Sequence, residues 1–287
     1  MPYLIISVVC SVLVSVLLKL MQRRGVDTSQ AITWNYLAAS VLCFLLLDPP
    51  LAALAHAGAP HLELALLALL LPGIFLALSA SVRAAGIVRT DVAQRMSLVL
   101  SLLAAFLWFG EQPDTLRIAG LALGVAAIAC LVARPGRDAP GEGWKAWALP
   151  LLVLVGYASV DVLLKHLSAA GTPFAASLQA AFVAAFLVML AVQVLRAWRT
   201  RTAITRQGLW SGLLLGALNF ANILFYVKAH RALPDSPAVV FSMMNIGVVV
   251  LGTLVGVFGF GERLSRVNLL AIPLAIVAIG LIAASLA

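Results

Sequence analysis

The sequence predicts an all-α integral membrane protein with ten transmembrane helices, arranged as two inverted five-helix repeats. Composition favours the membrane class, because 63% of the 287 residues are hydrophobic and only 10% are charged. A soluble domain is about 45–50% apolar and about 25% charged, and the apolar excess would lie on its surface as large exposed patches. Run length is the second observation, since the apolar runs reach the roughly 20 residues that a helix needs to cross a bilayer.

The apolar runs are continuous, which favours helices over the strands of a membrane barrel. A barrel strand alternates apolar and polar residues over about 10 positions, whereas residues 118–133 include no charged side chain. Polar residues, Pro and Gly separate the runs from one another. The expected spans are residues 3–22, 29–47, 63–84, 90–109, 114–133, 146–167, 173–195, 207–229, 236–259 and 264–286.

The two halves of the chain resemble each other. The tetrapeptide VLLK at 16–19 recurs at 162–165, and the tripeptide FGE at 109–111 recurs at 260–262. A linker rich in Pro and Gly, residues 134–141, lies between them and separates five spans from five. These matches, in the same order in both halves, predict an internal repeat.

An odd number of spans in each half places the second half in the membrane with the opposite orientation. We expect the first five-helix repeat at residues 1–137 and the second at 138–287. Inverted repeats are common in secondary transporters, whose substrate sites lie near the membrane midplane between the repeats.

Basic residues predict the orientation of the spans. Cytoplasmic loops are enriched in Lys and Arg, and 15 of the 19 basic residues fall on one side of the predicted spans. The other side holds Arg117, Lys165, Lys228 and Arg231. We therefore expect a multi-pass protein of the cell inner (plasma) membrane with both termini on the non-cytoplasmic side. The net charge of +8 is explained by basic residues in the loops, so we expect no nucleic acid as a partner.

The five-plus-five layout and the FGE tripeptides at the ends of the fourth and ninth spans resemble the drug/metabolite transporter (DMT) superfamily, in its ten-helix EamA-type form. The resemblance covers essentially the whole chain. Family members export amino acids, drugs or other metabolites, and related branches move nucleotide-sugars and phosphorylated sugars. The resemblance therefore implies a transporter of small molecules and not an enzyme, and it leaves the substrate open.

Charged side chains inside the spans are candidate functional groups, because a charge at the centre of a membrane helix costs about 2.5–3.5 kcal/mol. Asp161 and Lys165 lie four residues apart on one helix face and form a candidate coupling pair in which Asp161 exchanges a proton. Alternatively, Lys165 extends to the membrane interface and Asp161 neutralises it. Arg95, four residues after Asp91, either binds an anionic substrate group or anchors the cytoplasmic end of its helix with Asp91.

Uncharged polar residues complete the candidate substrate site. In the eighth span, Asn219, Asn222 and Tyr226 form one stripe, which either lines a cavity or hydrogen-bonds to neighbouring helices. The same two interpretations apply to the remaining candidates. For each of them taken alone, a hydrogen bond between helices is at least as well supported as a place in a cavity. The remaining candidates for substrate binding are Trp34, Asn35, Tyr157, Gln179 and Asn245.

No motif for ATP binding, hydrolysis or metal binding occurs in the sequence, so no catalytic residue, metal ligand or cofactor is expected. Gly208, Gly212 and Gly216 repeat every fourth residue, a spacing that lets helices pack closely. Glu111 and Glu262 follow Gly at the ends of their spans. We expect them to mark span boundaries and to cap the helix that comes next.

The leading hypothesis is a secondary transporter that exports a small polar or amphipathic metabolite (an amino acid, a drug or a related solute) by alternating access. The expected partners are the small-molecule substrate and the lipid bilayer. Proton antiport and facilitated diffusion both fit the sequence, and so do a monomer and a homodimer. The alternatives are a flippase for a lipid-linked substrate and a membrane enzyme or assembly partner without transport activity.

Overall fold

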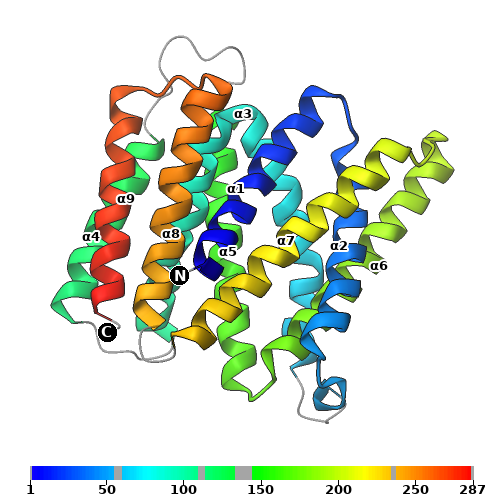
Figure 1. The fold of residues 1–287 in the computed structure, drawn as a ribbon, viewed down its shortest axis with the longest axis horizontal. Coiled ribbons are helices and arrows are strands. Elements are labelled where there is room, and N and C mark those ends of the chain that lie inside the picture. The colour runs from blue at the N-terminus through cyan, green and yellow to red at the C-terminus, as the bar shows by residue number, and fades with distance from the viewer. Residues whose placement is uncertain (1, 55–59, 109–113, 133–143, 234–236, 286–287) are drawn as a thin grey trace. The chain divides into compact units, whose positions relative to one another are not determined.

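The computed structural model describes residues 2–54, 60–108, 114–132, 144–233 and 237–285, and all regular structure in this part is helical (Figure 1). Eight of these helices are long and apolar enough to cross a membrane, and Thr115–Cys130 is a shorter apolar helix. The prediction of an all-helical, multi-pass membrane protein is therefore confirmed. The elements are α1 (Pro2–Arg23), α2 (Thr28–Leu47), η1 (Leu51–Leu54), α3 (His61–Trp108), α4 (Thr115–Val132), α5 (Lys145–Ala169), α6 (Phe174–Thr200), α7 (Arg206–Ala232), α8 (Pro237–Leu254), η2 (Val255–Gly259) and α9 (Arg266–Ala284).

The long helix α3 is folded back on itself at Gly86. The φ and ψ angles of Gly86 are 88° and 172°, a conformation that is essentially restricted to glycine. The hydroxyl oxygens of Ser81 and Thr90 lie 2.8 Å apart across this break, although nine residues of straight helix would separate them by about 13.5 Å. Helix α3 thus consists of two segments, 61–85 and 87–108, and the boundary predicted between the third and fourth spans falls at this turn.

The helices form two compact units. The first unit contains residues 1–16, 77–158 and 221–287, and the second contains 17–76 and 159–220. Each unit takes segments from both halves of the sequence, so the units are not the predicted repeats. The repeat boundaries given above stay a prediction, and the linker at 134–141 lies outside the described residues.

In the first unit, α4 and α9 pack side by side and run in opposite directions (Figure 1). At one end, Arg117 Nε of α4 donates a hydrogen bond to Ser285 Oγ, just past the end of α9, at 3.3 Å. At the other end, Asn268 Nδ2 of α9 donates to the carbonyl oxygen of Cys130 of α4 at 2.9 Å. These two polar contacts fix both ends of an otherwise apolar helix pair.

In the second unit, α2 and α6 form a similar antiparallel pair. Gln193 Nε2, near the end of α6, donates to Ser29 Oγ, near the start of α2, at 2.7 Å. Gln179 Nε2, near the start of α6, donates to Ser40 Oγ of α2 at 3.0 Å. The pair is therefore held by side-chain amides at two levels along its length.

Helix α7 also packs closely on α2 within the second unit. A Cβ atom at Gly212 would collide with the carbonyl oxygen of Ala31, and one at Gly216 would collide with the carbonyl oxygen of Asn35. The structure thus places these glycines at a close contact between helices, as their spacing of four predicted.

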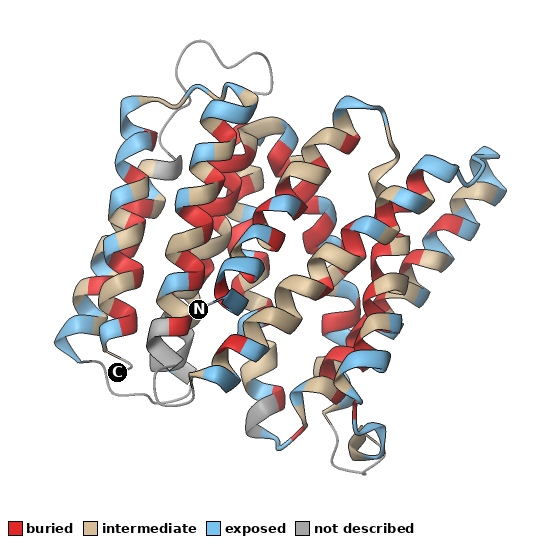
Figure 2. Cartoon of the chain, viewed as in Figure 1, coloured by how far each residue is buried: buried red, intermediate tan, exposed pale blue. Residues whose placement is uncertain are grey.

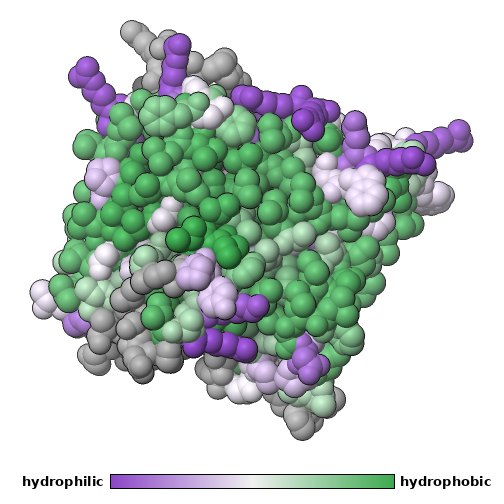
Figure 3. Space-filling model, in the orientation of Figure 1, coloured by the Kyte–Doolittle hydropathy of each residue, from purple (hydrophilic) through white to green (hydrophobic). Residues whose placement is uncertain are grey.

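Exposed apolar side chains cover the outer faces of the helices. Figure 2 shows buried and exposed residues alternating along each helix, and Figure 3 shows that hydrophobic residues dominate the visible surface while hydrophilic ones gather near helix ends. Trp198 and Phe258 are 80% and 82% exposed. Such apolar surfaces are stable in contact with lipid, whereas in water they would have to be covered by polar residues.

Candidate functional site

Three serines on one face of α1 organise a polar cluster in the first unit. Ser7, Ser11 and Ser15 are spaced four residues apart, and side chains at this spacing lie on the same side of a helix. Ser7 and Ser15 are buried. We call these three serines and the polar side chains that they contact the serine-row cluster.

The guanidinium of Arg95, on the second segment of α3, lies at the middle of the serine-row cluster. Its Nη2 donates to Ser11 Oγ at 2.7 Å, and its Nη1 donates to Asn245 Oδ1 of α8 at 3.3 Å. Asn245 is oriented by its own Nδ2, which donates to the carbonyl oxygen of Phe241 at 2.9 Å. The structure thus brings together Arg95 and Asn245, which the sequence predicted separately as substrate-binding residues.

Asn222, from α7, contacts Ser7 at the N-terminal end of the serine row. The Ser7 hydroxyl lies 2.9 Å from both Asn222 Oδ1 and the Asn222 carbonyl oxygen, and 3.3 Å from Met244 Sδ. One turn further along α7, the ring of Tyr226 lies edge-on to the His230 ring with centroids 4.6 Å apart. Two residues of the predicted stripe therefore contribute to the first unit.

Asp91 lies beside Ser15 at the C-terminal end of the serine row, where α1, α3 and α8 meet. Its side chain is only 2% exposed, and its Oδ1 accepts a hydrogen bond from Ser15 Oγ at 2.7 Å. Its Oδ2 has no hydrogen-bond partner among the described residues and faces Gly252 of α8, where a Cβ atom would lie 2.5 Å from it. Arg95 follows one turn later on the same helix.

Glu262 holds the start of the second α3 segment. Its Oε1 accepts from the backbone N–H of Ile87 at 2.6 Å and its Oε2 from that of Val88 at 3.1 Å. The expectation that Glu262 caps the next helix was wrong, because Ser265 caps α9 by accepting from Asn268 N at 3.1 Å. The π-helical turn η2 follows α8, and the backbone N–H of Glu262 donates to the carbonyl oxygen of Gly256 in this turn at 3.0 Å. The matching residue Glu111 lies outside the described residues.

The remaining predicted residues are distributed as follows. Tyr157 is partly buried in the first unit. In the second unit, Asn35 is fully buried and neither polar atom of its amide has a hydrogen-bond partner among the described residues, while Gln179 bonds to Ser40 as described above. The others in the second unit are Trp34, Asn219 and Lys165, all partly buried, and Asp161, which is exposed.

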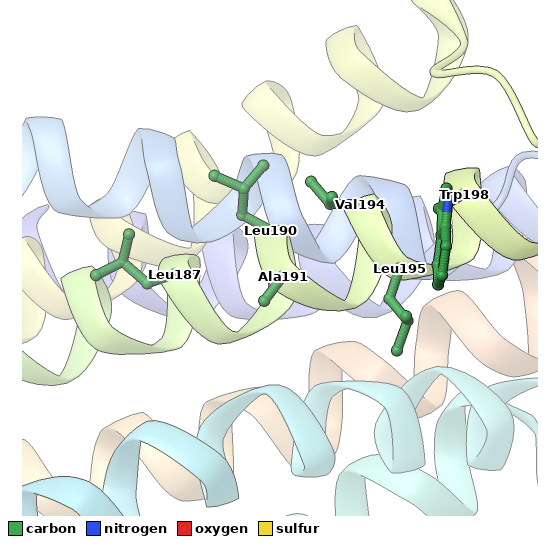
Figure 4. A pocket seen from close by; sticks show the side chains of 6 residues that line it. All are labelled: Leu187, Leu190, Ala191, Val194, Leu195 and Trp198. Atoms are coloured by element: carbon green, nitrogen blue, oxygen red, sulfur yellow. The ribbon is translucent and has the colours of Figure 1, made fainter.

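An apolar hollow of about 440 Å³ lies along one face of α6 (Figure 4). Its lining includes no ionisable side chain, so it suits an acyl chain better than a polar solute. The residues that line it are Leu187, Leu190, Ala191, Val194, Leu195 and Trp198.

A separate charged contact stabilises the start of α2. Asp27 accepts hydrogen bonds from the backbone N–H groups of Ser29 and Gln30 at 2.9 and 3.2 Å, and Arg196 Nη2 of α6 lies 2.8 Å from its Oδ2. Burial raises the pKa of Asp27, but the hydrogen bonds and the charge of Arg196 outweigh it and hold the pKa below its ordinary value of 3.8. This contact joins helix ends and is structural.

The sequence reasoning missed the serine row and the contact between Glu262 and α3. A signal for the first was present, since serines at a spacing of four in an apolar run form a polar stripe. The contact between Glu262 and α3 had no local sequence signal, because Glu262 and Ile87 are 175 residues apart.

These observations define a multi-pass α-helical membrane protein with a buried polar cluster. Residues 1–133 match the EamA-like transporter family. The chain is 39% identical over 285 residues to an uncharacterized protein of Haemophilus influenzae, with 97% of this chain and 96% of that protein covered. A protein crystal structure with 16% sequence identity shares the fold, with a TM-score of 0.59 over 99% of this chain and 98% of that chain. Residues 1–133 therefore belong to the EamA-like transporter family of the DMT superfamily, and this match together with the apolar helices supports a membrane transporter of that type.

Proposed function

We propose that this transporter is a secondary exporter of a small polar or amphipathic metabolite that carries an anionic group. The observation that carries the proposal is the placement of Arg95, whose guanidinium donates hydrogen bonds to Ser11 and Asn245 in the polar cluster. A guanidinium presents several donors in one plane and matches carboxylate or phosphate well, and such charge-assisted hydrogen bonds are the strong ones. Amino acids and related carboxylates are therefore the first class to test.

The proposal includes ten spans in two inverted repeats. The two segments of α3 and the other eight α-helices of the described residues add up to ten. In that order α4 and α9 are the fifth and tenth spans, and α2 and α6 are the second and seventh. Both pairs are antiparallel, which supports repeats of opposite orientation. Alternating access would follow from movement of one repeat against the other, with both termini on the non-cytoplasmic side of the inner membrane.

The experiment is a comparison of extracellular metabolites from cells that overproduce the wild type, Arg95→Gln or Arg117→Gln at equal membrane levels. The glutamine at position 95 keeps hydrogen-bonding capacity and removes the charge. Arg117 is the matched control, because it contacts Asp114 and Ser285 at one end of the α4 and α9 pair. We expect one class of anionic or zwitterionic compounds to accumulate outside with the wild type and with Arg117→Gln, and at least tenfold less with Arg95→Gln.

Equal export by Arg95→Gln and the wild type would contradict the assignment of Arg95. No change in the medium with any of the three proteins would contradict export. Redistribution of a lipid-linked compound between the two leaflets, without release, would favour a flippase instead.

A further inference from the structure

We propose that Asp91 is the proton-binding site of this transporter and that its proton affinity depends on the charge at Arg95. This inference rests on the proposed function. It assigns coupling to the first unit, instead of to Asp161, the residue favoured by sequence alone.

The first argument is the position of the Asp91 carboxyl. It is 2% exposed and lies in the second segment of α3, one turn before Arg95. A carboxylate charge in such surroundings is costly unless it is paired and well hydrogen-bonded. Asp161, in contrast, is exposed, so the helices of this chain do not enclose its carboxyl as they enclose that of Asp91.

The second argument is the sparse hydrogen bonding of Asp91. A carboxylate that is built to stay ionised accepts several donors. Asp91 accepts one, from the neutral hydroxyl of Ser15, and its Oδ2 has no hydrogen-bond partner in the part of the chain that the structure describes. Gly252 opposes this oxygen and leaves it space that any side chain would fill. Proton binding and release at Oδ2 therefore require no rearrangement of an existing hydrogen bond.

The third argument is electrostatic and links the proton to the substrate. The charged groups that act on Asp91 are Arg95 on its own helix and Glu262 after η2. The faces of α1 and α8 that touch it present the uncharged residues Ser15 and Gly252. An anion bound to Arg95 would cancel the positive charge that favours ionised Asp91. By linkage, the proton at Asp91 and the anion at Arg95 then bind more tightly together than apart.

The test uses the purified full-length protein and needs no substrate. Infrared difference spectra are recorded over a pH titration for the wild type, Asp91→Asn, Asp161→Asn and Arg95→Gln. The signal is the carbonyl stretching band of a protonated carboxylic acid in a buried site. Arg95→Gln imitates the neutralised guanidinium.

We expect a band that titrates in the wild type, is lost in Asp91→Asn and is unchanged in Asp161→Asn. In Arg95→Gln its midpoint should move to higher pH by about one unit or more, the shift typical of losing a neighbouring Arg. A band that persists in Asp91→Asn, or disappears in Asp161→Asn, would overturn the proposal. An unmoved midpoint in Arg95→Gln would overturn the link to the substrate site.

If Asp91→Asn does not fold, Ser15→Ala serves in its place, because loss of the hydroxyl donor should also move the midpoint to higher pH. An unmoved midpoint in Ser15→Ala would again overturn the proposal. The two proposals can fail separately. Export without a titrating Asp91 band contradicts only this inference. A titrating band without export of any compound contradicts the proposed function.

Discussion

Replacing Glu262 by alanine should destabilise the protein strongly, although this residue lies in a short connection between helices. Its two carboxylate oxygens accept the backbone N–H groups of Ile87 and Val88. Both of these residues are buried, at 0% and 2% exposure, so water does not replace the lost acceptors.

The magnitude follows from the number of donors left without a partner. Each buried N–H group that loses its acceptor costs about 1–3 kcal/mol, so Glu262→Ala should lower the free energy of unfolding by about 2–6 kcal/mol. Glu262→Gln keeps one acceptor oxygen and should cost about half as much, since the amide nitrogen repels the second N–H group. The predicted free energy of unfolding therefore decreases in the order wild type, Glu262→Gln, Glu262→Ala.

The assay is reversible unfolding in mixed micelles with increasing denaturing detergent, followed by circular dichroism. Glu63→Ala is the control, because Glu63 is an acidic residue in the first turn of the same helix α3. A loss below about 0.5 kcal/mol for Glu262→Ala, which is the usual range for surface substitutions, would refute the capping role. So would an equal loss for Glu63→Ala.

Three further predictions concern stability. Gly86→Ala should lower the free energy of unfolding by at least about 1–3 kcal/mol, because Gly86 has a φ of 88°. Gly73→Ala should be neutral or stabilising, because a Cβ there meets nothing within 4 Å; equal unfolding midpoints for the two variants would contradict this. The pKa of Asp27 is lowered in the folded state, so its contribution to stability is present above pH 3.8 and is lost as the pH falls through the lower folded value; melting curves of Asp27→Asn should approach those of the wild type only in acid. Gly212→Val should reduce the yield of folded protein in size-exclusion chromatography, because its Cβ would meet the carbonyl oxygen of Ala31; a normal profile would argue against close packing there.

The helical framework was predictable because membrane spans are encoded locally. Run length and hydropathy depend on neighbouring residues only, so α2 at Thr28–Leu47 agrees closely with the expected 29–47. The turn at Gly86 was foreseen as a break for the same reason. The C-terminal end of α6 was less predictable. This helix continues to Thr200, beyond the expected 195, and Arg196 in its last turns contacts Asp27 at the start of α2.

The candidate site was only partly predictable, since its contacts join residues that are far apart in the chain. Polar residues in apolar spans pointed to Arg95, Asn222 and Asn245, and the structure places all three in the serine-row cluster or at its edge. Sequence spacing favoured Asp161 over Asp91, because spacing describes only neighbours on the same helix. Burial, which distinguishes the two, depends on the helices packed against that residue.

The contact of Glu262 with α3 also bears on how the charge of this carboxylate is compensated. The peptide dipoles of a helix sum to about half a positive elementary charge at its N-terminus, and the segment that begins at Ile87 presents this end to the Glu262 carboxylate. Part of the negative charge of Glu262 is therefore balanced by the peptide groups at the start of this segment.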